Sequence, residues 1–124
     1  MSSKSTLDGK VALITGGARR IGAATARILH AAGMRLVVHY RSSNEAAVAL
    51  KTELDAIRTD SVLLVPGDLC DESLFNELIE QTNNSFGRLD MLINNASSFY
   101  PTPFGETTSA QFEDLINTNL KAPY

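Results

Sequence analysis

A glycine-rich turn near the N-terminus carries residues that could bind a phosphate. Gly16, Gly17 and Gly22 lie in the segment Thr15–Gly22, directly after the mostly apolar run Val11–Thr15. Glycine allows a sharp turn and a close approach of the backbone to a phosphate, and a helix that follows would offer free amides and the positive end of its dipole. A plain strand-to-helix loop would need similar glycines. The position after the first predicted strand favours nucleotide binding.

The residues after the second apolar run bear on the choice of nucleotide. The segment His39–Ser43 contains no carboxylate, and the first one downstream is Glu45. NAD-binding units usually place Asp or Glu here to hold the ribose hydroxyls. Arg41 and Ser42 can instead bind a 2′-phosphate, and Arg20 adds positive charge at the same end of the sheet. We therefore predict NADPH rather than NADH. The alternatives are a solvated surface arginine and a capping box of Ser42 with Glu45.

Two further positions are candidates for polar contacts. Asp68 and Leu69 follow the third apolar run, where a carboxylate could accept from an adenine amino group or begin a helix. Asn119 lies in an apolar helical stripe, seven residues after Phe112. A buried amide needs hydrogen-bond partners, so Asn119 is expected either to tie down a neighbouring loop or to serve a site.

Alternating strands and helices must position these residues. Short apolar runs alternate with stripes at helical spacing, which predicts βαβ units, a parallel sheet and an α/β fold of the Rossmann-like, doubly wound class. The continuous apolar character of the runs favours a sheet covered on both faces. The predicted strands are Val11–Thr15, Arg35–His39, Val62–Val65 and Leu89–Ile93.

The helices have predicted faces and ends. Gly33 and Gly87 are expected stops, Asp71 is an expected N-cap, and Thr108 with Gln111 is a candidate capping box. The first helix carries the apolar stripe Ile21, Ala24, Ile28, Leu29 and Ala32. The last predicted helix carries Phe112, Leu115, Ile116, Asn119 and Leu120 on one face.

The chain is predicted to form one domain. We expect residues 1–6 to be disordered and residues 7–124 to be an NADP-binding Rossmann domain that is incomplete at its C-terminus. A complete doubly wound sheet has two halves of about three strands each, whereas four strands with their flanking helices are predicted here. The fourth strand should therefore be an exposed edge.

Composition excludes several classes of function. The 124 residues are 44% hydrophobic, with a formal net charge of -3, so a packed core is feasible and nucleic acid is not an expected partner. Cys70 is the only cysteine, and no Cys/His cluster has the spacing of a metal site. No run reaches the roughly 18 apolar residues of a membrane span, and residues 1–6 lack the apolar stretch of a signal peptide. A cytoplasmic protein that binds neither a metal nor a membrane is predicted.

Several of these segments together resemble the short-chain dehydrogenase/reductase family. The resemblance rests on Thr15-Gly16, Asp68-Leu69, Asn94-Asn95-Ala96 and Asn119. It implies that the Asn-Asn-Ala segment stabilises the central sheet and lines the nicotinamide site. It also implies that Asn119 is a catalytic residue that holds a water in a proton relay, and Asn119-x-x-x-Pro123 supports this choice over Asn117.

One departure from the common family pattern indicates a subgroup. Arg20 stands where the family usually has glycine, and pteridine reductases resemble this chain in having arginine there. The segments 94–103 and 39–42 are also similar to theirs. This implies that Arg20 contacts cofactor phosphate and a pterin, that Ser97 contacts both, and that Phe99 stacks on the pterin, although Phe99 could instead anchor the loop. The residues predicted to bind NADPH are Gly16, Arg20, Ile21, Tyr40, Arg41, Ser42, Asp68, Leu69, Asn95, Ala96 and Ser97.

The proton donor of this family is not found in the chain. Family chemistry uses Tyr-x-x-x-Lys, but Tyr40 and Tyr100 are followed at that spacing by Asn44 and Phe104, and Tyr124 is the last residue. The predicted function is an NADPH-dependent pterin reductase, of which this chain is the cofactor-binding half and inactive alone. The alternatives are a 3-oxoacyl-carrier-protein reductase and a non-catalytic nucleotide-binding module. The resemblance also implies a homo-oligomer, specifically a tetramer.

Overall fold

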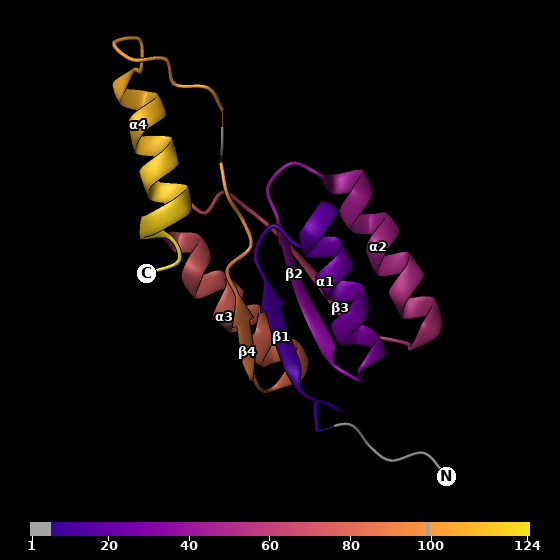
Figure 1. The fold of residues 1–124 in the computed structure, drawn as a ribbon. Helices are drawn as coiled ribbons and strands as arrows, with labels where there is room; N and C mark the ends of the chain where they lie inside the picture. The colour runs from indigo at the N-terminus through magenta and orange to yellow at the C-terminus, as the bar shows by residue number, and fades with distance from the viewer. Residues whose placement is uncertain (1–5, 99) are drawn as a thin grey trace.

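A parallel sheet organises the part of the chain that the structure describes. The computed structural model describes residues 6–98 and 100–124, so the predicted disorder of residues 1–6 falls, apart from Thr6, outside the described residues. The strands are β1 (Val11–Ile14), β2 (Arg35–Tyr40), β3 (Val62–Pro66) and β4 (Met91–Ile93), in the order β3-β2-β1-β4 (Figure 1). The helices are α1 (Arg20–Ala31), α2 (Asn44–Ile57), α3 (Ser73–Phe86) and α4 (Ser109–Ile116), and the π-helical turn η1 (Asn117–Lys121) follows α4.

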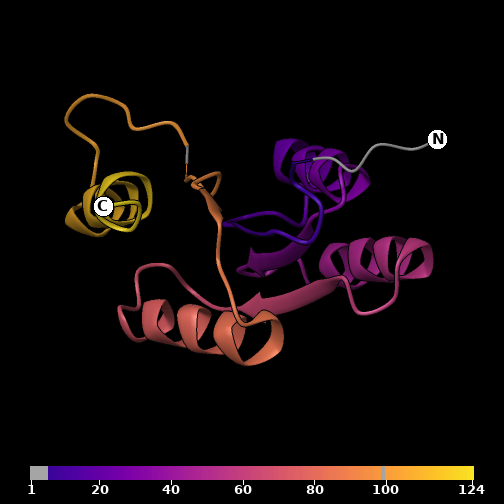
Figure 2. The same cartoon turned by 90° about the horizontal axis from the view of Figure 1, so that it is seen from below.

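The strand order creates a switch point beside β1. From β1 the chain moves outward through β2 to β3, then returns through α3 to place β4 on the other side of β1. Helices α1 and α2 cover one face of the sheet and α3 lies on the opposite face (Figure 2). In open α/β sheets the loops separate at such a reversal, and ligands bind in the crevice beyond the carboxyl ends of the strands. The predicted α/β, Rossmann-like architecture is confirmed.

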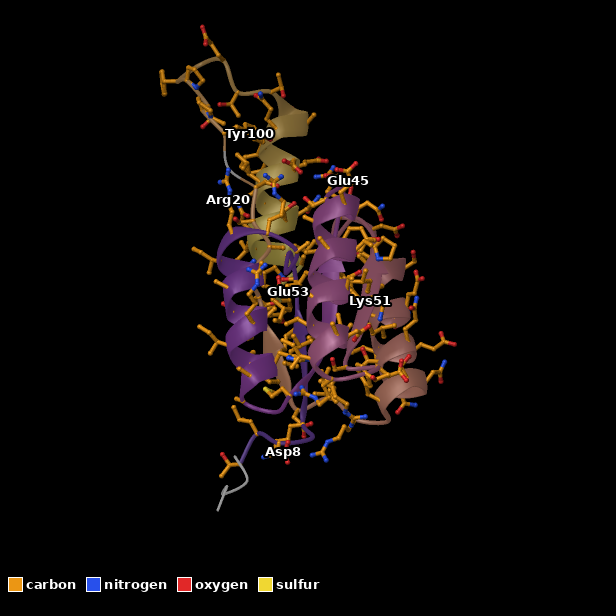
Figure 3. All side chains as sticks on the ribbon, turned by 90° about the vertical axis from the view of Figure 1, so that its right-hand side faces the viewer. Asp8, Arg20, Glu45, Lys51, Glu53 and Tyr100 are labelled. Carbon is orange, nitrogen blue, oxygen red and sulfur yellow. The ribbon has the colours of Figure 1, made fainter. Side chains whose placement is uncertain are left out.

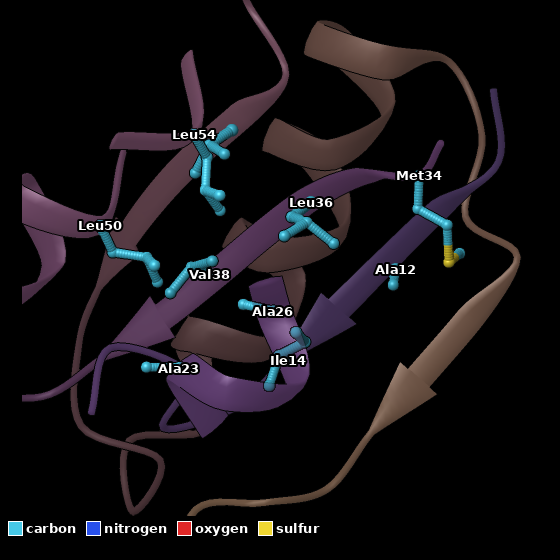
Figure 4. Packing of buried hydrophobic residues seen from close by; sticks show 10 residues of the cluster. Ala12, Ile14, Ala23, Ala26, Met34, Leu36, Val38, Leu50 and Leu54 are labelled. Atoms are coloured by element: carbon cyan, nitrogen blue, oxygen red, sulfur yellow. The ribbon is translucent and has the colours of Figure 1, made fainter. Parts of the chain in front are cut away.

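The core lies mainly on the face covered by α1 and α2. Alternate residues of the strands point to opposite faces, so Ala12 and Ile14 pack with Leu36 and Val38 toward these helices, while Val11 and Leu13 point toward α3. Figure 4 shows the first group closely packed between the sheet and the helices. The larger cluster consists of Ala12, Ile14, Ala23, Ala26, Met34, Leu36, Val38, Leu50, Leu54 and Val62.

Helix α1 is rotated relative to the predicted stripe. Its buried residues are Gly22, Ala23, Ala26 and His30, whereas Ile21 and Ile28 are 75% and 70% exposed. Of the predicted apolar stripe, Ile21, Ala24 and Ile28 are exposed, while Leu29 packs against the core. The reason is close packing at Gly22, where an added Cβ would lie 2.5 Å from the Gly16 carbonyl oxygen. This contact turns the small residues toward the sheet.

Strand β4 is short and forms one edge of the sheet. It pairs only with β1 among the described residues, as predicted for the fourth strand, and Leu92 is 51% exposed. Asp90 fixes its beginning, because the Val11 amide donates to Asp90 Oδ2 over 2.9 Å and the Asp90 amide donates to the Val11 carbonyl over 2.9 Å. Leu89 and Asp90 thus precede the strand rather than belong to it.

The predicted helix ends are confirmed in part. Thr108 and Gln111 form the predicted capping box of α4, and Gly87 ends α3 with φ of 73°. The predicted capping role of Ser42 is wrong, because the chain enters α2 through Ser43 and no side chain caps that helix. Asp71 accepts from the Ser73 amide over 3.0 Å, although α3 begins one residue later than an N-cap at Asp71 requires.

Helix α4 and η1 stand beyond the carboxyl ends of the strands (Figure 1). No residue of α4 is buried within the described structure, and Phe112 and Leu120 are 60% and 64% exposed. Asn119 is exposed and Thr118 is buried in its place, so the expectation of a buried Asn119 is wrong. The wider π-helical turn at Asn117–Lys121 changes the spacing that the predicted stripe assumed.

We predict that Asp90 contributes acid-sensitive stability. Hydrogen bonds from the Arg88 guanidinium and then from the Val11 amide lower the pKa of Asp90 from 3.8 to about 2. The unfolded chain therefore binds this proton first as the pH falls, so the contribution is full above about pH 4 and is lost toward pH 2. Asp90→Asn should lower the melting temperature at pH 7, and the difference from wild type should shrink between pH 4 and 2.

Thermal unfolding followed by circular dichroism from pH 2 to 7 measures this difference. Glu80→Gln, on the exposed surface of α3, is the matched control and should leave the pH profile unchanged. A constant difference between wild type and Asp90→Asn across this range would contradict the role of the Asp90 charge.

Candidate nucleotide-binding site

The loops that follow all four strands enclose one pocket. It has a volume of about 470 Å³, within the range of small-molecule sites, and lies over the switch point between β1 and β4. Every residue predicted to bind cofactor lines it, which shows that the sheet brings these distant segments together. The lining residues are Gly16, Ala18, Arg19, Arg20, Ile21, His39, Tyr40, Arg41, Ser42, Ser43, Asp68, Leu69, Asn95, Ala96, Ser97, Ser98 and Thr118.

The glycine turn is shaped by two close backbone contacts. Gly16 has φ of 61°, a conformation that favours glycine, and a Cβ there would lie 2.9 Å from the Ala96 Cα. At Gly22 a Cβ would meet the Gly16 carbonyl and the Asn95 side-chain nitrogen, which lies 2.7 Å away. The turn is therefore folded against the segment after β4, and α1 starts directly at the pocket.

Thr15 and Asn95 join the ends of β1 and β4. The Thr15 hydroxyl oxygen accepts from the amides of Asn95 and Ala96, each over 3.1 Å. In return, the Asn95 side-chain nitrogen donates to the Gly16 carbonyl over 2.9 Å. Thr15 is buried, so these hydrogen bonds give partners to a hydroxyl that is shielded from water.

His39 connects the glycine turn to the loop after β3. Its Nδ1 accepts from the Gly16 amide over 3.1 Å, and its Nε2 lies 2.8 Å from the Gly67 carbonyl oxygen, to which it donates. Burial lowers the pKa of the ring, opposed by the hydrogen bond to Gly67 and the charge of Asp68. The role of His39 was not predicted from the sequence. A polar side chain inside a buried strand, which must find partners, was the available signal.

Arg20 has a strained backbone at the mouth of the pocket. Its φ is 52°, in the left-handed region that costs a non-glycine residue about 1 kcal/mol or more. The side chain is exposed and lies at the same end of the molecule as Tyr100 (Figure 3). The common family pattern has glycine at this position, which suits this conformation. Arginine at this position places a guanidinium at the pocket, although its backbone is strained.

Arg41 is held by carboxylates beside the pocket. Its guanidinium lies 3.3 Å from Asp68 and 3.9 Å from Asp114 of α4, and its side chain is 60% exposed. The pKa of Asp68 is lowered chiefly by the hydrogen bond from the Cys70 amide, and further by Arg41 and His39. Asp68 therefore carries its charge at neutral pH and can accept hydrogen bonds.

Asn119 ties η1 to the segment after β4. Its side-chain nitrogen donates to the Ser98 carbonyl and its oxygen accepts from the Ser98 amide, both over 2.8 Å. Asn119 therefore ties down a neighbouring loop, which is one of the two roles that the sequence indicated for it. Asn119 does not line the pocket, while its neighbour Thr118 does. Phe99, predicted to stack on a pterin, lies outside the described residues.

A comparison with known families identifies the chain. The family model described as short chain dehydrogenase matches residues 10–124. The chain belongs to the short-chain dehydrogenase family. Members of this family are oxidoreductases that generally bind NAD(P)H.

Individual relatives of this short-chain dehydrogenase differ in their names. Pteridine reductase 1 of Leishmania tarentolae is 34% identical over 92% of this chain and 50% of its own length. Versicolorin reductase 1 of Aspergillus parasiticus is 34% identical over 100% of this chain and 47% of its own length. L-fucose dehydrogenase of Mus musculus is 36% identical over 100% of this chain and 44% of its own length. The chain thus spans about half the length of these relatives.

The described part of this short-chain dehydrogenase contains neither a candidate metal site nor a candidate membrane-spanning helix. Within residues 6–98 and 100–124, no three His, Cys, Asp or Glu side chains gather in a way that could hold a metal ion. None of the helices in this part of the chain has the length and apolar character needed to cross a bilayer.

We predict that Thr15→Val destabilises the fold although the two side chains have similar shapes. The substitution removes the acceptor of the Ala96 amide and one of the two acceptors of the Asn95 amide, which also donates to the Ile93 carbonyl. Each lost hydrogen bond costs about 0.5–1.5 kcal/mol. Urea unfolding should show a loss of about 2 kcal/mol. Thr52→Val on the exposed surface of α2 is the control and should change little. Equal stability of Thr15→Val and wild type would contradict the proposed join between β1 and β4.

We also predict that two substitutions at Arg20 differ in their effect on the stability of the fold. Arg20→Gly removes both the charge and the backbone strain, whereas Arg20→Ala removes the charge and keeps the strain. Arg20→Gly should therefore be about 1 kcal/mol more stable than Arg20→Ala, as measured by urea unfolding. If Arg20→Ala proves as stable as Arg20→Gly, the left-handed conformation at this position carries no cost.

Proposed function

We propose that this chain forms the NADPH-binding half of a reductase that transfers hydride to a pterin or dihydropterin. The observation that carries the proposal is the charge at the end of β2, where Arg41 and Ser42 line the pocket and no carboxylate follows Tyr40 directly. We further propose that the whole protein works in the cytoplasm as a homo-oligomer, specifically a tetramer, with no membrane or nucleic-acid partner.

The geometry of the glycine turn fits the pyrophosphate of a dinucleotide. Gly16 and Gly22 bring the backbone close to the segment after β4, and the first amides of α1, from Arg20 onward, have no partner within the helix. A helix N-terminus of this kind favours an anion. Arg19 and Arg20 add two positive charges at the same end of the pocket.

The end of β2 fits a 2′-phosphate. Arg41 is exposed and, among the described residues, forms ion pairs with carboxylates at 3.3 and 3.9 Å. The Ser42 hydroxyl does not cap α2. A phosphate dianion can displace the longer contact to Asp114 and accept from both residues. Tyr40 is oriented by its hydrogen bond to Asn44 over 3.0 Å. Asp68 remains available to accept from the adenine amino group.

The pterin assignment is supported by Arg20 and Ser97. Both line the pocket, and Arg20 can offer planar donors to a ring oxygen and nitrogen. A relative named pteridine reductase is among the similar proteins, while others are named for versicolorin and fucose. The competing proposals are therefore a short-chain reductase for another carbonyl, such as a 3-oxoacyl group, and a non-catalytic nucleotide-binding module.

Proton transfer needs a group outside these residues. NADPH, when bound, supplies the hydride, and no Tyr-x-x-x-Lys pair occurs in the 124 residues. In the complete enzyme, Asn119 is proposed to hold a water molecule of the proton relay. In this chain its amide holds Ser98, which positions the segment that carries Ser97.

We predict that Arg41→Ala discriminates between the two dinucleotides. The substitution removes the guanidinium next to the 2′-phosphate, and a hydrogen bond to a charged group contributes about 1.5–3 kcal/mol. NADPH binding to the 124-residue chain, followed by nucleotide fluorescence, should weaken by about tenfold or more, with little change for NADH. Arg27→Ala, which removes an exposed arginine paired with Glu53 on α2, should change neither affinity. Equal loss for NADPH and NADH would refute the assignment.

Turnover of the isolated chain separates the proposals. With NADPH and a dihydropterin we expect binding of the nucleotide but no steady oxidation, because the proton donor is missing. Quenching of NADPH fluorescence by a pterin, and not by a 3-oxoacyl thioester, would support the substrate class. Steady NADPH oxidation by this chain would contradict the need for the missing pair.

A further inference from the structure

His39 contacts the glycine turn through both its backbone and its side chain. Its carbonyl oxygen accepts from the Gly17 amide over 2.9 Å, while its ring accepts from the Gly16 amide over 3.1 Å. On the other side, the ring donates to the Gly67 carbonyl over 2.8 Å, and the Gly67 amide donates to the Tyr40 carbonyl over 3.0 Å. His39, which lies within β2, thus joins the loop after β1 to the loop after β3.

The contacts of the ring require one protonation state. A neutral imidazole has one nitrogen that accepts and one that donates, whereas a protonated ring has two donors. At His39 the Gly16 amide needs an acceptor at Nδ1, and the Gly67 carbonyl needs a donor at Nε2. Protonation would place an N–H opposite the Gly16 N–H. Because His39 is only 2% exposed, water cannot replace the lost partner without a movement of the turn.

We propose that neutral His39 is a positioning residue that holds the glycine turn in its phosphate-binding shape, and that protonation of His39 releases the turn and weakens nucleotide binding. The inference rests on the proposed function for its effect on NADPH, while the coupling of His39 to Gly16 is a property of the chain alone. It assigns a role to a residue that would not itself touch the substrate.

The surroundings of His39 fix the direction of the pH dependence. The charged groups that share the pocket are Arg19 and Arg20 from the glycine turn, Arg41 after β2 and Asp68 after β3, and the segment after β4 contributes only neutral side chains. Burial lowers the pKa of His39 below 6.5, with Asp68 acting in the opposite direction. The turn is therefore held at neutral pH, and it is released as the pH falls below the ordinary histidine range.

The first experiment uses the free chain and needs no nucleotide. NMR of the labelled protein should show His39 with its proton on Nε2 at pH 7.5, and the Gly16 amide resonance should move with the titration of the His39 ring. His30, the other histidine, is buried beside Ser61 at the opposite end of the sheet and serves as the internal control. A Gly16 resonance that ignores His39 would overturn the proposal.

The second experiment measures NADPH affinity from pH 8 to 5 for wild type, His39→Asn and His39→Gln. Asparagine can place an acceptor near the Nδ1 position and does not titrate, and glutamine can place a donor near Nε2. A single linked proton lowers affinity by at most tenfold per pH unit, so the wild type should lose about tenfold more than His39→Asn. The 2′-phosphate, whose own second pKa lies near 6, contributes equally to all three proteins.

The outcomes separate the two proposals. Identical pH profiles for wild type and both variants would overturn the role of His39 while leaving NADPH binding intact. If no protein binds NADPH at any pH, the proposed function fails, and the NMR titration alone decides the coupling. If His39→Asn does not fold, the comparison with His39→Gln and the wild-type titration still test the proposal.

Discussion

The conformation of Gly16 is the constraint on which the pocket depends. Its left-handed φ of 61° turns the chain out of β1, and each of its neighbours then contacts a different strand end. Its amide is held by the His39 ring and its carbonyl by the Asn95 side chain, while Thr15 holds the Asn95 backbone. His39 and Asn95, which hold the amide and the carbonyl of Gly16, are both distant from it in the sequence. The backbone conformation at Gly16 therefore depends on the whole sheet. The positions of α1 and of the pocket follow from it.

The sheet could be predicted because its signals are local. Short apolar runs closed by Gly16-Gly17 and by Pro66-Gly67 mark strands without any knowledge of their partners, and the four strands occur where expected. The inward face of α1 could not be predicted in this way. Hydrophobicity favours Ile21 and Ile28, but at Gly22 the helix lies against the glycine turn and Asn95 so closely that no side chain fits there. That closeness is a property of the fold and leaves no mark in the helical spacing.

The pocket was predicted better than the role of its individual residues. Parallel strands end at one edge of the sheet, so residues after each strand converge there, and Arg41, Asp68 and Asn95 do so. The role of His39 was missed because a polar side chain inside a buried strand indicates that it must find partners, but not which groups those partners are. Asn119 was expected to be buried, but the π-helical turn exposes it and buries Thr118 instead. A change of helical spacing within one turn is decided by contacts such as that of Asn119 with Ser98.

The pairing of β4 with β1 has a consequence for the order of folding. The hydrogen bonds that complete the pocket join residues 79 to 81 positions apart in the chain, whereas β1 and β2 are separated by a single helix. Closing such a long loop costs conformational entropy before any contact compensates for it. The β1–α1–β2–α2–β3 part can therefore assemble first, with the pocket open on one side. On the ribosome, this side of the pocket cannot close until Asn95 and Ala96 have emerged.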